Sequence, residues 1–265
     1  MAEQAASADV TRRIAWEGFT NARDLGGLPT QDGRVTRFGA YIRSADFRSA
    51  TEAGWRMARD SGVRTVIDLR NDVESRRDTE WQSTQSAGPA RSAVAAPVVP
   101  PPGDIRRSEV ALDNIEDTGF RQFLKRERLD IPPLSFRPFL DRKPERCAAV
   151  ITALGSAAPG GVLFHCRFGR DRTGLVTLLV LALAGVEPEA IADDFEMSTE
   201  PLKTLFASMG EPDPAPGIEA ALAERDTTAR DAILATLDGF DAGTYLLAAG
   251  ASHASLAAIR RRLLG

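Results

Sequence analysis

Residues 162–174 read Val162-Leu163-Phe164-His165-Cys166-Arg167-Phe168-Gly169-Arg170-Asp171-Arg172-Thr173-Gly174, and the rest of the chain can be placed around this stretch. An apolar run of strand length ends at Cys166, a loop with three arginines follows, and residues 175–184 form an apolar run of helix length. A strand, a loop and a helix in this order aim several backbone N–H groups and the positive end of the helix at one point. The stretch therefore predicts an anion-binding loop, and phosphate is the commonest such anion.

The thiol of Cys166 lies inside this predicted loop. A thiol beside arginine and a helix N-terminus loses its proton more readily than a free cysteine, and the thiolate is a nucleophile. Arg172 follows six residues later, and its planar, permanently charged guanidinium can bind two oxygens of one phosphate. The hydroxyl of Thr173 could hydrogen-bond the sulfur and make it a better leaving group. The pattern is typical of phosphoryl transfer to a cysteine.

The pattern His165-Cys166-x5-Arg172-Thr173 resembles the signature of the cysteine-dependent protein-tyrosine phosphatase superfamily. The longer string is similar to the loop of an atypical bacterial branch, with Arg170 where lysine is usual. Members of that branch act on phosphotyrosine, and some also on phosphoserine, phosphothreonine or phosphoinositides. The resemblance implies no cofactor, inorganic phosphate as the product, and catalysis by Cys166 and Arg172. The residues that it implies in substrate binding are His165, Arg167, Phe168, Gly169, Arg170 and Thr173.

Two other interpretations remain. A rhodanese-like sulfurtransferase also carries a cysteine in a loop with arginine and glycine, but its loop is typically one residue shorter. A catalytically silent phosphate-binding module is the other, and the presence of Cys166, Asp171 and Arg172 together argues against it.

A general acid must protonate the leaving group. None of the three tryptophans is followed by Pro-Asp, so the mobile acid loop of classical tyrosine phosphatases is absent from the sequence. Asp171 is the first candidate, because the similar myotubularin phosphatases carry an Asp just before the signature arginine. Its other interpretation is an ion pair that orients Arg170 or Arg172. Asp68 is the reserve candidate.

The substrate class stays open at this stage. Phosphotyrosine is expected first, but Arg167 and Arg170 would also suit the extra phosphate of a phosphoinositide. Phosphotyrosine needs a deep, narrow pocket, and the depth of a pocket cannot be read from a sequence.

Helix and strand patterns alternate before Cys166. Residues 51–61 predict a helix capped by Thr51, residues 63–69 and 40–42 predict strands, and residues 144–154 predict a helix that starts at Pro144. This rhythm predicts an α/β fold, with a central, mostly parallel sheet flanked by helices and the phosphate-binding loop between a strand and a buried helix. Because ligands gather at the carboxyl ends of parallel strands, we expect Asp68 and Cys166 to face one site.

The length suits a single domain over residues 1–265. Residues 104–142 mix charges with scattered phenylalanines, and predict either a helical flap over the site or a peripheral packing layer. Residues 188–265 predict a helical C-terminal layer, with a helix that opens at Pro188 and further helices over 218–237 and 252–264. Residues 92–99 predict a further strand.

Two more strings resemble the same phosphatase branch, namely Asn21-Ala22-Arg23-Asp24-Leu25-Gly26-Gly27 and Arg43-Ser44-Ala45-Asp46. On the residues alone, the glycines of the first string predict a turn. The second string reads equally well as a polar turn with a surface arginine.

The composition limits the range of partners and locations. A net charge of −4 argues against a general binder of nucleic acid or anionic membranes, and the apolar run 175–184 is too short to span a bilayer. With two histidines in the chain we expect no metal site, and His165 should shape the loop. Two cysteines and no secretory signal predict the cytoplasm, with nonclassical export left open. Cys147 should be a small buried residue of its helix, with a protective disulfide to Cys166 as the alternative.

Overall fold

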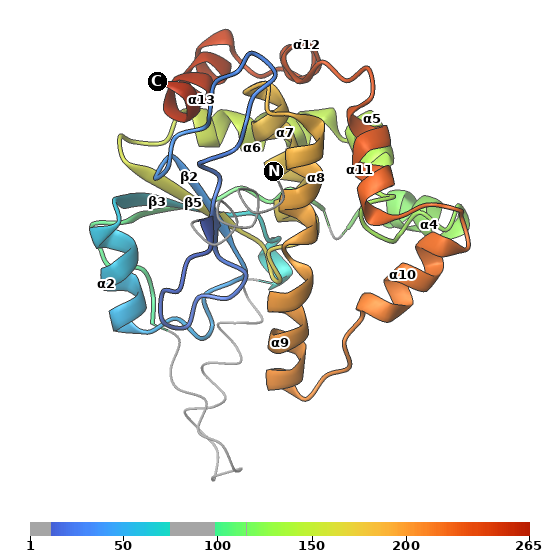
Figure 1. The fold of residues 1–265 in the computed structure, drawn as a ribbon, viewed down its shortest axis with the longest axis horizontal. Helices are drawn as coiled ribbons and strands as arrows, with labels where there is room; N and C mark the ends of the chain where they lie inside the picture. Colours follow the sequence, from blue (N-terminus) through green and yellow to red (C-terminus); the bar gives the residue numbers. More distant parts are fainter. Residues whose placement is uncertain (1–11, 75–98, 115) are drawn as a thin grey trace.

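The computed structural model describes residues 12–74, 99–114 and 116–265, and in these ranges five strands form one sheet in the order β1-β2-β5-β3-β4 (Figure 1). Strand β1 runs antiparallel to β2, and the other neighbours are parallel. The predicted central, mostly parallel sheet is confirmed. The strands are β1 (Arg23–Asp24), β2 (Tyr41–Ser44), β3 (Val63–Asp68), β4 (Arg106–Glu109) and β5 (Gly161–His165).

Helices flank the sheet and continue as a helical C-terminal region (Figure 1). Helix α2 (Glu52–Asp60) packs on β3, on one face of the sheet. On the other side lie α6 (Pro144–Gly155), α7 (Asp171–Leu183) and α13 (His253–Leu264). The remaining helices are α4 (Thr118–Arg126), α5 (Phe136–Arg142), α8 (Pro188–Glu196), α9 (Thr199–Met209), α10 (Ala215–Ala223), α11 (Ala229–Leu237) and α12 (Ala242–Ala248).

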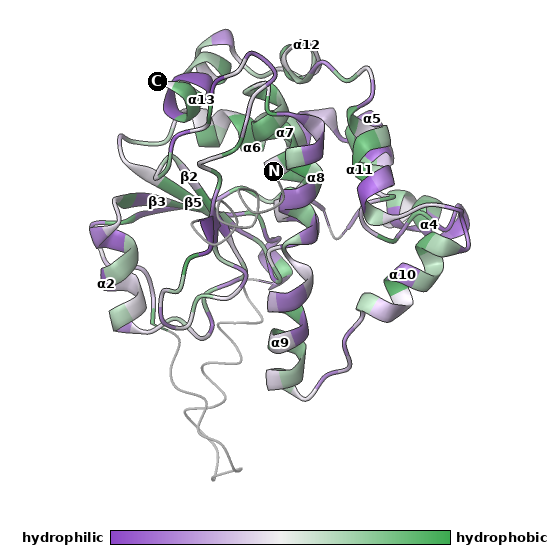
Figure 2. Ribbon diagram, viewed as in Figure 1, coloured by the Kyte–Doolittle hydropathy of each residue, from purple (hydrophilic) through white to green (hydrophobic). Residues whose placement is uncertain are grey.

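Each face of the sheet has its own hydrophobic core, because successive side chains of a strand point to opposite faces. In β5, Val162 and Phe164 join the larger core under α6 and α7, whereas Leu163 joins a smaller core with Trp55 of α2. Figure 2 shows green and purple alternating along α2 and α9. Nearly every side chain of α7 is buried, as the apolar run predicts for a central helix.

Local sequence signals explain where several helices begin. The hydroxyl of Thr51 accepts a hydrogen bond of 3.0 Å from the N–H of Gly54, and this closes the first turn of α2. Ser252 caps α13 in the same way, and Pro144 and Pro188 stand at the starts of α6 and α8. These starts agree with the sequence expectations.

Other boundaries differ from expectation. The single helix expected over 218–237 is wrong, because α10 ends at Ala223 and α11 begins only after Thr228. Thr228 and Asp231 form a reciprocal capping box that starts a new helix. The helix that opens at Pro188, for which no end was predicted, stops at Glu196, and α9 follows as a separate helix. Of the strand expected over 92–99, residues 92–98 lie outside the described part.

Residues 104–142 contain β4, α4 and α5. Strand β4 was missed because its four residues are polar and exposed, as an edge strand permits. Phe136 of α5 is buried against Phe195 of α8, with ring centroids 5.8 Å apart. Within the described ranges, no helix combines the length and the apolar character that a membrane crossing needs.

Candidate active site

Cys166 follows directly on β5, between β2 and β3 in the sheet, and the loop of residues 166–170 leads into α7. The helix begins at Asp171, four residues earlier than its apolar run indicates. The positive end of a buried helix therefore lies immediately behind the loop. Cys166 has an exposed fraction of 3 %, and its position at a carboxyl end of the sheet agrees with the sequence expectation.

The backbone carbonyls of the loop are held from outside. The carbonyl oxygen of Cys166 lies 3.2 Å from Nδ1 of His165, and that of Arg167 accepts from the N–H of Asp46 at 3.1 Å. The carbonyl oxygen of Arg170 accepts from an N–H of α7 at 2.7 Å. These contacts fix three of the five peptide units between Cys166 and the helix.

Two side chains from the start of the chain hold the other two carbonyls. Nδ2 of Asn21 donates to the carbonyl oxygens of Phe168 and Gly169, at 3.1 and 3.2 Å. A guanidinium nitrogen of Arg43 also donates to the oxygen of Gly169, at 2.7 Å. A planar trans peptide points its C=O and N–H in opposite directions. The N–H groups of residues 167–171 are therefore turned away from the partners of these carbonyls.

Position 169 requires glycine. Gly169 has φ +69°, a conformation that side chains disfavour, and an added Cβ would lie 2.4 Å from the backbone oxygen of Ser44. The loop therefore lies tightly against the end of β2.

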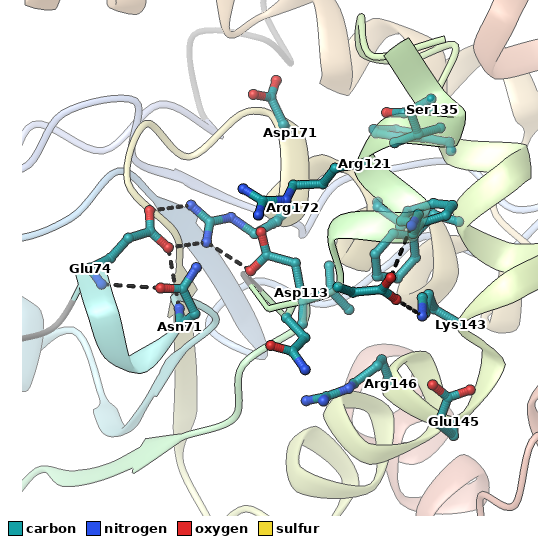
Figure 3. A pocket seen from close by; sticks show the side chains of 18 residues that line it. Asn71, Glu74, Asp113, Arg121, Ser135, Lys143, Glu145, Arg146, Asp171 and Arg172 are labelled. Atoms are coloured by element: carbon teal, nitrogen blue, oxygen red, sulfur yellow. Dashed lines mark hydrogen bonds and ion pairs between the residues drawn. The ribbon is translucent and has the colours of Figure 1, made fainter. Parts of the chain in front are cut away.

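Arg172 lies in the first turn of α7, and its guanidinium is held by acidic side chains (Figure 3). Glu74 accepts two hydrogen bonds from it, of 2.5 and 2.7 Å, and Asp113 lies 3.2 Å away. Burial by itself would lower the pKa of Arg172, but the hydrogen bonds of Glu74 and the charges of Cys166 and Asp113 raise it on balance. The structure thus brings Arg172 and Cys166 close enough to interact electrostatically.

Glu74 was missed in the sequence, although a local signal marks it. Asn71 and Glu74 form a reciprocal pair, in which each side chain accepts a hydrogen bond from the backbone N–H of the other, at 3.1 and 3.2 Å. The pattern Asn-x-x-Glu directly after a strand is that of a capping box, and it ties the carboxylate in place. Arg172 follows β5, Glu74 follows β3 and Asp113 follows β4. Three neighbouring parallel strands therefore bring these side chains together at the carboxyl end of the sheet.

The two candidate acids lie in different surroundings. Asp171 is 38 % exposed in its side chain and pairs through Oδ1 with Nε of Arg170 at 2.8 Å. Asp68 is fully buried, and it pairs with Arg70 at 2.9 Å and Arg107 at 3.0 Å. Burial would raise the pKa of Asp68, but the electrostatic interaction with His165 and the bonds with Arg70 lower it to about 2. Asp68 is therefore a carboxylate at neutral pH.

His165 is buried beneath the loop and is neutral at neutral pH. Burial lowers its pKa to about 4, although the nearby Asp68 opposes this. Its Nε2 lies 3.6 Å from Asp68 and its ring packs 4.1 Å from that of Phe47. The expected bond from the hydroxyl of Thr173 to sulfur is not seen, since this buried hydroxyl has no hydrogen-bond partner among the described residues.

The remaining loop side chains contact protein. The guanidinium of Arg167 lies 5.4 Å from the ring of Phe168, and this ring packs 4.9 Å from Phe206 of α9. Arg170 bonds Asp171. Their roles in binding a substrate stay predictions.

Arg23 and Arg43, from the two motif strings near the N-terminus, belong to a buried charge cluster that contacts the loop. Arg12, Arg23 and Arg43 all pair with the single carboxylate of Asp194 on α8. Burial would raise the pKa of Asp194, but the three guanidinium groups hold it below its ordinary value. Arg43 is completely buried, so the interpretation of this position as a surface arginine is wrong. Asp24 accepts from the N–H groups of Gly26 and Gly39, which fixes the predicted turn.

A cavity of about 440 Å³ opens beside Arg172 (Figure 3). Its apolar wall comes from α4, α5 and the segment after β4, and the two loop-proximal residues that line it are Asp171 and Arg172. Its apolar lining residues are Leu112, Phe120, Leu124, Phe136, Phe139 and Leu175.

Cys147 lies in α6 and is fully buried, and both cysteines are free thiols. Burial raises the pKa of Cys147 to about 12. The expectation of a small buried residue at this position agrees with this environment. Among the described residues, no group of three or more His, Cys, Asp or Glu side chains is placed to hold a metal ion.

Comparisons with known proteins assign this chain to a family. The model of the tyrosine phosphatase family matches residues 14–265. A protein of Cupriavidus necator named "putative tyrosine-protein phosphatase" is 29 % identical, over 89 % of this chain and 83 % of its own. The triple specificity protein phosphatase PtpB of Mycobacterium tuberculosis is 27 % identical, over 94 % and 98 %. The crystal structure of TpbA from P. aeruginosa is 16 % identical with a TM-score of 0.36, and covers 78 % of this chain and 84 % of its own. The chain therefore belongs to the tyrosine phosphatase family, an assignment that favours the phosphatase over the sulfurtransferase interpretation.

Proposed function

We propose that this enzyme hydrolyses phosphotyrosine through a phosphocysteine intermediate. The observation that carries the proposal is that the carbonyls of the loop after Cys166 are held by hydrogen bonds, which turns its amide N–H groups away from those partners, while Glu74 holds Arg172 close enough to Cys166 to interact with it. Backbone N–H groups and a guanidinium are the donors that stabilise the extra charge on a phosphoryl group in transfer.

The chemistry would run in two steps. The sulfur of Cys166 attacks phosphorus while the bond to the tyrosine oxygen breaks, and protonated Asp171 gives its proton to that oxygen. A water then attacks the phosphocysteine, Asp171 takes a proton from it, and inorganic phosphate leaves with the thiolate restored. Asp171 is preferred over Asp68 because it lines the cavity beside Arg172 and is partly exposed. Arg170 bonds its Oδ1, which leaves Oδ2 for the proton.

The cavity supports an aromatic leaving group. Phe120, Phe136 and Phe139 offer apolar contact to a phenyl ring whose phosphate lies in the loop. The same lining holds five carboxylates and four cationic side chains, so it has no excess of positive charge. This balance favours phosphotyrosine over the several phosphates of a phosphoinositide.

The test compares wild type with Cys166→Ser. Both are assayed on phosphotyrosine, phosphoserine and phosphothreonine peptides and on phosphoinositide vesicles, since one relative is named for triple specificity. We expect turnover of phosphotyrosine by wild type, and trapping of a phosphoenzyme at Cys166 on rapid acid quench. Oxyanion binding without turnover by the wild type would instead identify a silent binding module, and turnover by Cys166→Ser would exclude the cysteine mechanism.

A further inference from the structure

Two of the loop carbonyls are anchored by side chains from remote parts of the sequence. Asn21 is 147 residues from Phe168, and Arg43 is 126 residues from Gly169. The other carbonyls of residues 166–170 bond to the adjacent His165, to a backbone N–H after β2, or within α7. The middle of the loop therefore depends on the packing of the N-terminal segment.

These two anchors are themselves locked to one residue. Nη1 of Arg43 bonds Oδ2 of Asp194 at 2.6 Å, while Nη2 of the same guanidinium reaches the loop. Arg23 bonds Asp194 at 3.1 Å, and its Nη1 donates to Oδ1 of Asn21 at 2.6 Å. With its oxygen occupied in this way, the amide of Asn21 must turn its NH2 group toward the loop. Asp194 on α8 thus fixes the direction of both donors.

The orientation of a peptide unit decides its effect on a bound phosphate. If the unit between Gly169 and Arg170 were flipped, a carbonyl oxygen would face the anion and repel it. Held as it is, the same unit presents the N–H of Arg170. The guanidinium of Arg43 also interacts electrostatically with Cys166. Burial lowers the pKa of Arg43 overall, and the interaction with Cys166 opposes this shift.

We propose that Asn21 and Arg43, locked by Asp194, are positioning residues that keep the N–H groups of Gly169 and Arg170 directed at the substrate phosphate. The proposal rests on the proposed function, because it concerns the loop that would bind that phosphate. Its competitor is a purely structural cluster, in which the buried ion pairs hold the N-terminal segment to α8 and nothing more.

Arg12 provides a matched control. Like Arg43 it is a buried arginine that pairs with Asp194, but its other contacts are the carbonyl of Asp24 and the sulfur of Met197. Arg12→Lys and Arg43→Lys therefore disturb the same carboxylate, and only the second removes a bond to the loop. Lysine can reach one partner as a point charge but cannot bridge two as the guanidinium fork does.

Asn21→Gly is a second, milder test. Asn21 has φ +54°, which glycine adopts without strain, so this change removes the amide without forcing the backbone. It keeps the proposal testable if Arg43→Lys does not fold.

The variants are compared by thermal unfolding, by kcat and KM for p-nitrophenyl phosphate, and by calorimetric binding of tungstate in the Cys166→Ser background. We expect Arg43→Lys and Asn21→Gly to lose about 10²-fold in kcat/KM and to bind tungstate at least about tenfold more weakly. Arg12→Lys should stay within about threefold in both, at a similar loss of thermal stability.

Folded Arg43→Lys and Asn21→Gly proteins with undiminished tungstate affinity would overturn the proposal. Equal losses in Arg12→Lys and Arg43→Lys would overturn it too, since they would indicate a structural cluster. A failure of the proposed function looks different: wild type would then hydrolyse no phosphate ester, while tungstate binding would still report on the anchors.

Discussion

The guanidinium of Arg172 donates two hydrogen bonds, of 2.5 and 2.7 Å, to the carboxylate of Glu74. This pairing fixes the plane of the fork before any substrate arrives, so that less side-chain freedom is lost on binding. Glu74 itself is fastened to the backbone of Asn71. The signature arginine is therefore preorganised by a capping box that follows the neighbouring strand β3.

Replacing Glu74 by Gln should impair catalysis without removing a catalytic group. Gln keeps the shape and one acceptor but loses the charge, and charge-assisted hydrogen bonds contribute about 1.5–3 kcal/mol. We expect a loss of about 10- to 100-fold in kcat/KM for a phosphotyrosine peptide. Asp113→Asn is the control, because Asp113 is more exposed and makes one contact at 3.2 Å. Wild-type kinetics in Glu74→Gln would show that Arg172 needs no such support.

Asp171→Asn should reveal the general acid through its dependence on the leaving group. Proton donation typically contributes about 10²–10⁴-fold in rate. We expect a loss in that range in kcat for phosphotyrosine, and a much smaller one for p-nitrophenyl phosphate, whose leaving group is a stable anion. An equal loss on both substrates would assign Asp171 to the ion pair with Arg170 instead.

Asp68→Asn should behave differently from Asp171→Asn. Asp68 is already ionised at neutral pH, because burial is outweighed by His165 and Arg70 and its pKa is lowered to about 2. Its removal takes away the carboxylate that pairs with the buried Arg70 at 2.9 Å, while Asp46 stays 3.5 Å from the same guanidinium. We expect a lower melting temperature and no dependence of the rate loss on the leaving group. A leaving-group effect confined to Asp68→Asn would make Asp68 the acid.

Acid should destabilise the fold through His165. Burial lowers the pKa of His165 from 6.5 to about 4, so between these values the unfolded chain binds a proton that the folded one does not. The contribution of His165 to the free energy of unfolding is therefore fully present above pH 6.5, where the imidazole carries no proton in either state. It should fall by about 1.4 kcal/mol per pH unit as the pH drops toward 4. Urea unfolding across this range checks the slope, and His165→Asn should flatten it; an unchanged slope in the variant would contradict the assignment.

Much of the fold, and the strand-loop-helix unit that carries Cys166 and Arg172, could be predicted because their signals are local. Thr51 caps its helix, and the run from Val162 to Gly174 encodes strand, loop and helix in one stretch. The contacts of Glu74 and Asp113 with Arg172 were not predicted, because they depend on which strands become neighbours. Strand β4, which carries the chain to Asp113, has no apolar pattern to reveal it.

The buried charge cluster that contacts the loop was hidden for a further reason. The burial of Arg43 cannot be predicted from a single sequence, because arginine is usually exposed. Its partner carboxylate, Asp194, lies 151 residues away, and no local pattern indicates that the two residues pair. The string around Arg43 resembles the phosphatase branch, but the role of Arg43 in the loop follows only from its hydrogen bond to the carbonyl oxygen of Gly169.

The two thiols should differ sharply in reactivity. Cys147 is fully buried in α6. Burial raises its pKa to about 12, and a hydrogen bond with Tyr245 opposes this shift only in part. Cys166 lies within reach of the charges of Arg43 and Arg172. We expect iodoacetamide at neutral pH to alkylate Cys166 alone, and inorganic phosphate to protect it, as peptide mass spectrometry would show. In Cys147→Ser, iodoacetamide should label Cys166 as in wild type, and activity lost on treatment with peroxide should return on reduction as in wild type. If the activity of this variant did not return, the disulfide would be supported instead, because Cys147 would then be the partner that protects Cys166 from further oxidation.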